Sequence, residues 1–240
     1  MGGLIVEYDK KQFWIARQEW EDVLFIHIPV PFEHLQKYVP RPLELEAYQN
    51  QAWMSFVILR SNNSQLRGIP ITYPSFYQLN IRTYVNCNGN QGVYFLSIDA
   101  NTLPVVLGVK SLSIPQHFAD MNMRYKNDNI YFSSTRIHSE DQLFIKYRPL
   151  LNNIDTEHQS LTKWLTERYF MWFIKGDKII RGIVSHDPWV MKEAKLDIFK
   201  LKGFLPLLSE VGVEKPFIHY AERKQAYIHP FKIDGIYQAK

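Results

Sequence analysis

The sequence predicts a mainly β, β-rich α+β fold, and three observations support this prediction. Several segments alternate polar and apolar residues with a period of two, as half-buried strands do. Aromatic residues make up 15% of the 240 residues, with 14 Tyr and 15 Phe, and aromatic side chains favour strands. Segments with a helical pattern are few and short. We therefore expect roughly ten short strands and few short helices.

The most regular alternation lies at Tyr77–Val85 and predicts a strand with one polar face. This face carries Gln78, Asn80, Arg82 and Tyr84. A turn over residues 86–90 and a second apolar segment, Val93–Asp99, follow. We expect a hairpin with a loop somewhat longer than the tightest type.

The remaining elements follow from the same patterns. Further strands are expected at Val23–Ile28, Trp53–Leu59, Phe118–Tyr125, Ile130–Thr135, Gln142–Tyr147, Arg168–Ile174, Lys178–Ser185, Phe217–Tyr220 and Gln225–Phe231. Helices are expected over Leu103–Leu112, capped by Thr102, and from a Ser160 cap through Leu165. Lys175-Gly176-Asp177 predicts a hairpin turn. A sheet of this many strands usually curls or closes into a barrel, which can enclose a cavity.

Composition excludes several classes of protein. No repeat or Gly/Ser-rich linker divides the chain, so a single domain over residues 1–240 is expected.

The 28 Lys and Arg residues and the 24 Asp and Glu residues are scattered along the sequence, which argues against a nucleic-acid partner. Cys87 is the only cysteine, so no intrachain disulfide forms. Because no signal pattern or long apolar run occurs, we expect a cytoplasmic protein without a membrane partner. The oligomeric state stays open.

Three groups of residues are candidates for chemistry. Asn80, Arg82 and Tyr84 would form a polar cavity wall in which Arg82 binds a carboxylate or phosphate; the alternative is a solvated outer face. Glu167 could pair with Arg82 or act as an acid or base; the alternative is a surface ion pair. His186 and Trp189 could shape a pocket; the alternative is an ordinary turn.

Other kinds of site lack their sequence patterns. The eight histidines show no metal-ligand spacing, and no ligand pair includes the cysteine. The local motifs of serine hydrolases, P-loop enzymes and Rossmann dehydrogenases are missing. We therefore expect neither a metal nor a cofactor.

Four segments together resemble one family. These are Gln78–Val85, Gly92–Ala100, Leu165–Tyr169 and Phe217–Ala221. They are similar to segments of the YqjF-like group of uncharacterised bacterial proteins, which is distantly similar to acetoacetate decarboxylase. The similarity runs from about Trp14 to Phe231. It implies a single barrel or cone around a central pocket, with Arg82 facing that pocket.

The resemblance also implies a departure from decarboxylase chemistry. Acetoacetate decarboxylases have two adjacent lysines where this chain has Gln116 and His117, and neither residue forms a Schiff base. Gln78 stands where the decarboxylase has a glutamate. Lys110 lies upstream, on the expected helix, with nothing to direct it to the pocket. The fold is therefore expected to be kept and the decarboxylation lost.

Three functional interpretations stay open. In the first, a cofactor-free enzyme binds a small carboxylate or oxygen-rich molecule, with His117 or Glu167 transferring a proton. In the second, the same pocket only binds or senses a small, anionic molecule. In the third, the barrel is filled and the role is structural. The residues expected to contact a ligand are Gln78, Asn80, Arg82, Tyr84, Gln116, His186 and Trp189.

Overall fold

The computed structural model describes residues 13–103, 115–155, 158–211 and 216–237, and strands dominate them. The helices are α1 (Phe32–Gln36), α3 (Ser160–Thr166) and α4 (Pro206–Val211). The strands are β1 (Ala16–Val30), β2 (Glu44–Leu45), β3 (Ala47–Tyr48), β4 (Gln51–Leu66), β5 (Thr72–Tyr73), β6 (Phe76–Cys87), β7 (Asn90–Ala100), β8 (Gln116–Lys126), β9 (Asn129–Arg136), β10 (Gln142–Asn153), β11 (Phe170–Lys175), β12 (Lys178–Ser185), β13 (Lys192–Lys202), β14 (Phe217–Ile228) and β15 (Lys232–Ile236). The mainly β prediction is confirmed.

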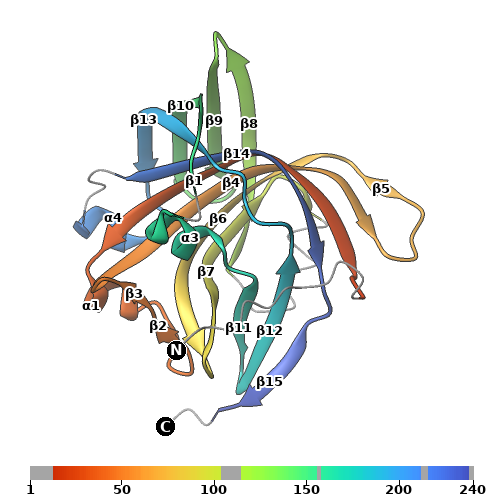
Figure 1. The fold of residues 1–240 in the computed structure, drawn as a ribbon, viewed down its shortest axis with the longest axis vertical. Helices are drawn as coiled ribbons and strands as arrows, with labels where there is room; N and C mark the ends of the chain where they lie inside the picture. Colours follow the sequence, from red (N-terminus) through yellow and green to blue (C-terminus); the bar gives the residue numbers. More distant parts are fainter. Residues whose placement is uncertain (1–12, 104–114, 156–157, 212–215, 238–240) are drawn as a thin grey trace.

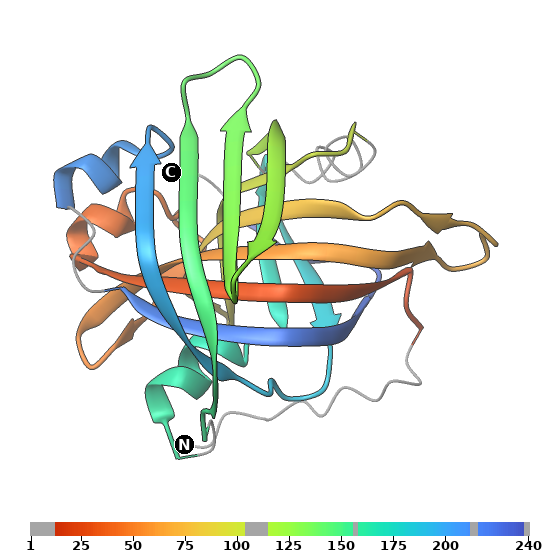
Figure 2. The ribbon, with the colours of Figure 1, turned by 90° about the horizontal axis from the view of Figure 1, so that it is seen from above.

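Strand pairing closes the sheet into two rings that share five strands (Figure 1). The larger ring runs β7-β8-β9-β10-β13-β14-β1-β4-β6 and returns to β7. The smaller ring runs β7-β11-β12-β14-β1-β4-β6 and also returns to β7. The shared strands β14, β1, β4, β6 and β7 therefore form a wall between two interiors. Figure 2 shows the green and light-blue strands of the larger ring (β8, β9, β10 and β13) crossing the red, orange and dark-blue strands of this wall.

Wall strands are buried on both faces, which explains their composition. In β1 every residue of Val23–Ile28 is at most 1% exposed. Leu24 and Ile26 pack with Phe132 of β9 in the core of the larger ring. Their neighbour Phe25 points to the opposite side, into the smaller ring. A strand with two buried faces reads as a continuous apolar run rather than as an alternation.

The expected hairpin of β6 and β7 is confirmed, but its loop is shorter than we predicted. Cys87 pairs with Asn90, so the turn consists of Asn88 and Gly89, with φ of 52° and 79°. Two positive φ values define the two-residue type I′ turn, whose twist matches that of the strands. The prediction was wrong because Asn86, Cys87 and Asn90 continue the ladder despite their turn-like composition.

Other predicted elements overlap the observed ones, but the sequence analysis did not predict β2, β3, β5, β13, β15, α1 or α4. β13 was missed because a bulge at Asp197 places Leu196 and Phe199 on the same face and breaks the alternation. β14 continues through the break that we expected after Tyr220. The helix over residues 160–166 is confirmed, but its N-cap is Gln159 rather than Ser160. The helix expected over 103–112 lies, apart from Leu103, outside the described residues. Within the described ranges, no helix has the length and apolar character needed to cross a bilayer.

Candidate functional site

A cavity of about 160 Å³ lies inside the smaller ring, and each of the ring's strands contributes to its wall. A single water needs only about 15 Å³ on this measure, so the cavity has room for a small organic molecule. Most of the wall is apolar, with Phe25, Phe95 and Phe173 among the largest side chains. The polar part of the wall consists of Gln18, Gln78, Asn80, Arg82, Thr166, Arg168 and His186.

Arg82 projects from β6 into this cavity. Its guanidinium carbon lies 5.7 Å from the centre of the Phe25 ring and 6.0 Å from that of Tyr84. The Nη2 group donates a long hydrogen bond of 3.4 Å to the Leu165 carbonyl, whereas Nε is buried without a partner. Burial lowers the pKa of Arg82, yet a guanidinium stays protonated in proteins. The side chain is thus a cation with an unused donor.

Arg168 brings a second guanidinium to the same cavity. Its Nη1 donates to Glu46 Oε2 at 2.6 Å and its Nε donates to the Trp164 carbonyl at 2.7 Å. Its Nη2 is buried without a partner. Arg168 is 6% exposed and lies over the rings of Trp164 and Tyr84, 4.4 and 5.4 Å from their centres.

The two arginines leave the cavity positively charged. Among the described residues, Glu46 is the carboxylate that pairs with Arg168, and no carboxylate pairs with Arg82. The described lining includes no Lys, Asp or Glu. Gln78 donates from Nε2 to Asn80 Oδ1 at 2.6 Å, so the amide protons of Asn80 stay available as donors. The polar end of the cavity is therefore suited to an anion.

His186 and Trp189 form the aromatic end of the cavity. The His186 ring lies 4.8 Å from the Trp189 ring and 4.9 Å from the Tyr169 ring. His186 Nδ1 donates to the Asp187 carbonyl at 2.7 Å, because a carbonyl only accepts. Burial lowers the pKa of His186 to about 4. At neutral pH the ring is therefore uncharged, and its Nε2 carries a lone pair.

The predicted site residues divide into two groups. Gln78, Asn80, Arg82, His186 and Trp189 line the cavity, whereas Tyr84, Gln116, His117 and Glu167 are not among the lining residues. Tyr84 is fully buried behind the two arginines. Glu167 accepts hydrogen bonds from the Trp189 amide, at 2.9 Å, and from the Tyr169 hydroxyl, so its carboxylate orients the aromatic end.

His117 and Gln116 lie where β8 begins. His117 pairs with Asp99 across the parallel β7–β8 contact, beside the buried ion pair of Asp99 and Arg136. Burial and the Arg136 charge lower the pKa of His117. Gln116 pairs with Ile98, which does line the cavity, and both polar atoms of its amide are buried without partners.

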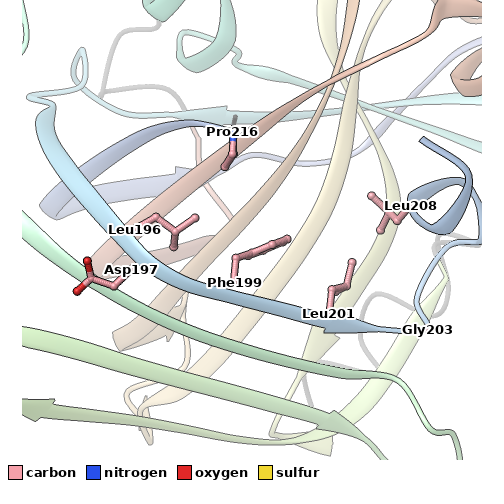
Figure 3. Close-up of a pocket in the computed structure, with 7 residues that line it drawn as sticks. All are labelled: Leu196, Asp197, Phe199, Leu201, Gly203, Leu208 and Pro216. Carbon is pink, nitrogen blue, oxygen red and sulfur yellow. The ribbon is translucent and has the colours of Figure 1, made fainter. Parts of the chain in front are cut away.

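A second cavity, of about 430 Å³, lies on the side of the larger ring (Figure 3). Figure 3 shows Leu196, Phe199 and Leu201 projecting from β13 on one side and Leu208 from α4, while Asp197 points away from them. The Asp197 carboxylate pairs with Lys146 at 3.2 Å. The one charged side chain among the described residues that line this cavity, Asp197, is therefore paired, and the smaller ring holds the better candidate site.

Sequence reasoning missed Arg168 and Thr166 as lining residues. Both belong to the segment Thr166–Tyr169 that drew attention to Glu167. The side chains that face inward there depend on where α3 ends and β11 begins, and α3 ends at Thr166. A clue existed, since an arginine two residues before the apolar strand Phe170–Lys175 is placed to be enclosed by that strand's packing.

Comparison with known proteins identifies the family. The model of the DUF2071 family, described as an uncharacterised conserved protein, matches residues 17–225. This chain belongs to the DUF2071 family. The uncharacterised protein YqjF of Bacillus subtilis is 34% identical over 227 residues, which cover 91% of this chain and 92% of that protein. The resemblance drawn from the four sequence segments is confirmed.

Solved structures show which fold this DUF2071 protein shares. The enduracididine biosynthesis enzyme MppR, complexed with pyruvate, superposes with a TM-score of 0.67 at 11% identity, over 96% of this chain and 95% of MppR. Acetoacetate decarboxylase from Legionella pneumophila superposes with a TM-score of 0.63 at 12% identity, over 99% of this chain and 95% of the enzyme. At such low identity the likeness establishes the acetoacetate decarboxylase-like fold alone.

Proposed function

We propose that the smaller-ring cavity binds a small carboxylate whose remaining part is apolar. The observation that carries this proposal is the pair Arg82 and Arg168, two enclosed cations that each keep one N–H group without an acceptor. An enclosed charge is costly unless it is paired and hydrogen-bonded. A planar carboxylate suits the donors of guanidinium groups, because charge-assisted hydrogen bonds are short and strong.

The rest of the wall defines the remainder of the ligand. The aromatic and aliphatic side chains around the arginines, such as Phe95 and Phe173, favour an uncharged carbon skeleton. A cavity of about 160 Å³ limits the whole ligand to roughly ten water-sized groups. MppR, which shares the fold, is described as complexed with pyruvate, a molecule of this class. Pyruvate is therefore the first probe.

Arg82→Met is expected to weaken pyruvate binding roughly 10- to 100-fold, because a hydrogen bond to a charged group contributes about 1.5–3 kcal/mol. Isothermal titration calorimetry measures the change. Arg60→Met is the matched control, since Arg60 pairs with Glu21 at the surface and does not line the cavity. Methyl pyruvate, which lacks the negative charge, should bind the wild-type protein as weakly as pyruvate binds the variant. Equal binding of pyruvate by Arg82→Met and the wild type would rule out the proposal.

His186 supports a second candidate function, the removal of a proton from the bound acid. Its Nε2 lone pair belongs to a ring that lines the same cavity as Arg82. In this step the C–H bond next to the pyruvate ketone breaks, and the proton moves to Nε2. The electron pair forms an enolate, whose charge the guanidinium groups stabilise. Return of a solvent deuteron then completes an exchange that needs no cofactor.

Deuterium exchange into the pyruvate methyl group tests this step. In D₂O the protein should accelerate the loss of the methyl proton NMR signal, and His186→Asn should abolish the acceleration. His138→Asn is the control, because His138 is exposed in a turn. If the wild-type protein and His186→Asn exchange pyruvate equally fast, the cavity binds without this chemistry. The described lining of the cavity contains no lysine. Borohydride should therefore trap no Schiff-base adduct of pyruvate on the protein.

A further inference from the structure

Behind the two arginines, a continuous chain of hydrogen bonds runs through the interior to the protein surface. Tyr84 Oη lies 2.6 Å from Ser55 Oγ, which lies 2.6 Å from His27 Nδ1. His27 Nε2 lies 3.1 Å from His219 Nδ1, and His219 Nε2 lies 3.1 Å from Thr162 Oγ1. Thr162 Oγ1 donates to Gln159 Oε1 at 3.0 Å. Gln159 is exposed, whereas the members from Tyr84 to Thr162 are fully buried.

The last contact fixes the direction of every other bond in the chain. Because Thr162 gives its proton to Gln159, it must accept one from His219 Nε2–H. His219 Nδ1 is then unprotonated and accepts from His27 Nε2–H. His27 Nδ1 in turn accepts from the Ser55 hydroxyl, and Ser55 accepts from Tyr84. The Tyr84 oxygen also lies 3.2 Å from the unprotonated His27 Nδ1, which is a second acceptor for the Tyr84 proton.

In this direction the Tyr84 oxygen gives its only proton to Ser55, so toward any other neighbouring group it can act only as an acceptor. The Tyr84 ring lies against both guanidinium groups, at 6.0 Å for Arg82 and 5.4 Å for Arg168. A phenol proton pointing at two cations would be unfavourable, whereas an oxygen that only accepts there stabilises them. Burial keeps His27 and His219 uncharged, since it lowers the pKa of His219 to about 4 and holds the pKa of His27 well below its ordinary range.

We propose that Ser55, His27, His219 and Thr162 are positioning residues of the cavity, which hold the Tyr84 oxygen as an acceptor toward Arg82 and Arg168. This inference rests on the proposed carboxylate site. It extends that site by a buried path that begins on α3, outside the cavity wall.

The tautomers of the two histidines test the direction of the chain in the free, wild-type protein. Nitrogen-15 NMR at neutral pH distinguishes a protonated from an unprotonated ring nitrogen. We expect His27 and His219 both to carry their proton on Nε2. A proton on Nδ1 of either ring, or a charged ring, would overturn the inference without any reference to a ligand.

Thr162→Val tests whether the buried hydrogen-bond chain affects ligand binding in the cavity. It removes the acceptor of the His219 proton, and it should weaken pyruvate binding roughly tenfold, while Thr162→Ser should restore wild-type affinity. Thr83→Val is the matched control, since Thr83 is a fully buried threonine whose hydroxyl donates to the Trp53 carbonyl. Neither residue belongs to the buried hydrogen-bond chain.

The outcomes separate the two proposals. If Arg82→Met weakens pyruvate binding and Thr162→Val does not, the hydrogen-bond chain has no positioning role and the proposed carboxylate site stands. If Thr83→Val weakens binding as much as Thr162→Val, the effect is general destabilisation, and the positioning role is again excluded. If Arg82→Met leaves binding unchanged, the carboxylate site is wrong and the positioning role falls with it.

Discussion

Replacing Arg136 with Met is expected to lower the free energy of unfolding by about 3–5 kcal/mol, because a buried carboxylate would lose its partner. Arg136 Nε and Nη2 bind the two oxygens of Asp99 at 2.7 and 2.9 Å. Its Nη1 binds Asp141 at 2.8 Å. The side chains of Arg136 and Asp99 are 5% and 0% exposed, so water cannot solvate the Asp99 charge in place of the guanidinium.

Urea denaturation measures this change, and two further variants locate its cause. Lys202→Met removes an exposed ion pair with Glu140 and should change the free energy of unfolding far less, because solvent screens an exposed pair. Combining Arg136→Met with Asp99→Asn should recover part of the lost stability, because the unpaired charge is then removed as well. If Arg136→Met and Lys202→Met cost the same, the buried pair makes no special contribution.

Stability is also expected to fall steeply as the pH decreases from 7 to 5. The pKa values of His186 and His219 are lowered to about 4 in the folded protein, against about 6.5 in an unfolded chain. Below pH 6.5 the unfolded chain therefore binds protons that the folded protein does not bind. Between pH 6.5 and 5, each of these histidines lowers the free energy of unfolding by about 1.4 kcal/mol per pH unit. Together they lower it by roughly 4 kcal/mol at pH 5. His27 acts in the same direction.

Urea denaturation at half-unit steps of pH checks this dependence. His186→Phe should remove about 1.4 kcal/mol per pH unit from the slope, since Phe fills the space beside Trp20 and Trp189 without titrating. Most carboxylates stay ionised above pH 5, so they contribute little in this range. A free energy of unfolding that stays constant between pH 7 and 5 would contradict the expectation, as would an unchanged slope in His186→Phe.

Most of the long strands were predictable from local sequence because burial on one or two faces leaves a direct pattern in composition. The side of β6 that carries Gln78, Asn80 and Arg82 was predictable for the same reason, since alternation fixes which residues share a face. The enclosure of that face was not predictable by alternation. It depends on β11 and β12, which lie about a hundred residues later and close the smaller ring through the β12–β14 contact.

The buried hydrogen-bond chain behind the cavity was even less predictable from the sequence. His27 and His219 are 192 positions apart in sequence and meet because β1 and β14 pair. A signal did exist in β1, where a histidine stands between Ile26 and Ile28 in an otherwise apolar run. A polar residue inside a strand with two buried faces needs a partner. The sequence alone does not name that partner, because no local rule sets the register of strands so distant from each other.

The shared wall of strands has a consequence for how such a protein can change over time. Because adjacent residues of β1 or β6 face different interiors, one set of positions determines packing in the larger ring and the interleaved set determines which molecule the smaller ring accepts. Ile81 packs in the apolar core of the larger ring while Arg82 presents its charge to the cavity. Selection can therefore replace every second residue of these strands and alter ligand preference while the stabilising residues stay fixed. A scaffold of this kind can diverge in chemistry faster than in architecture.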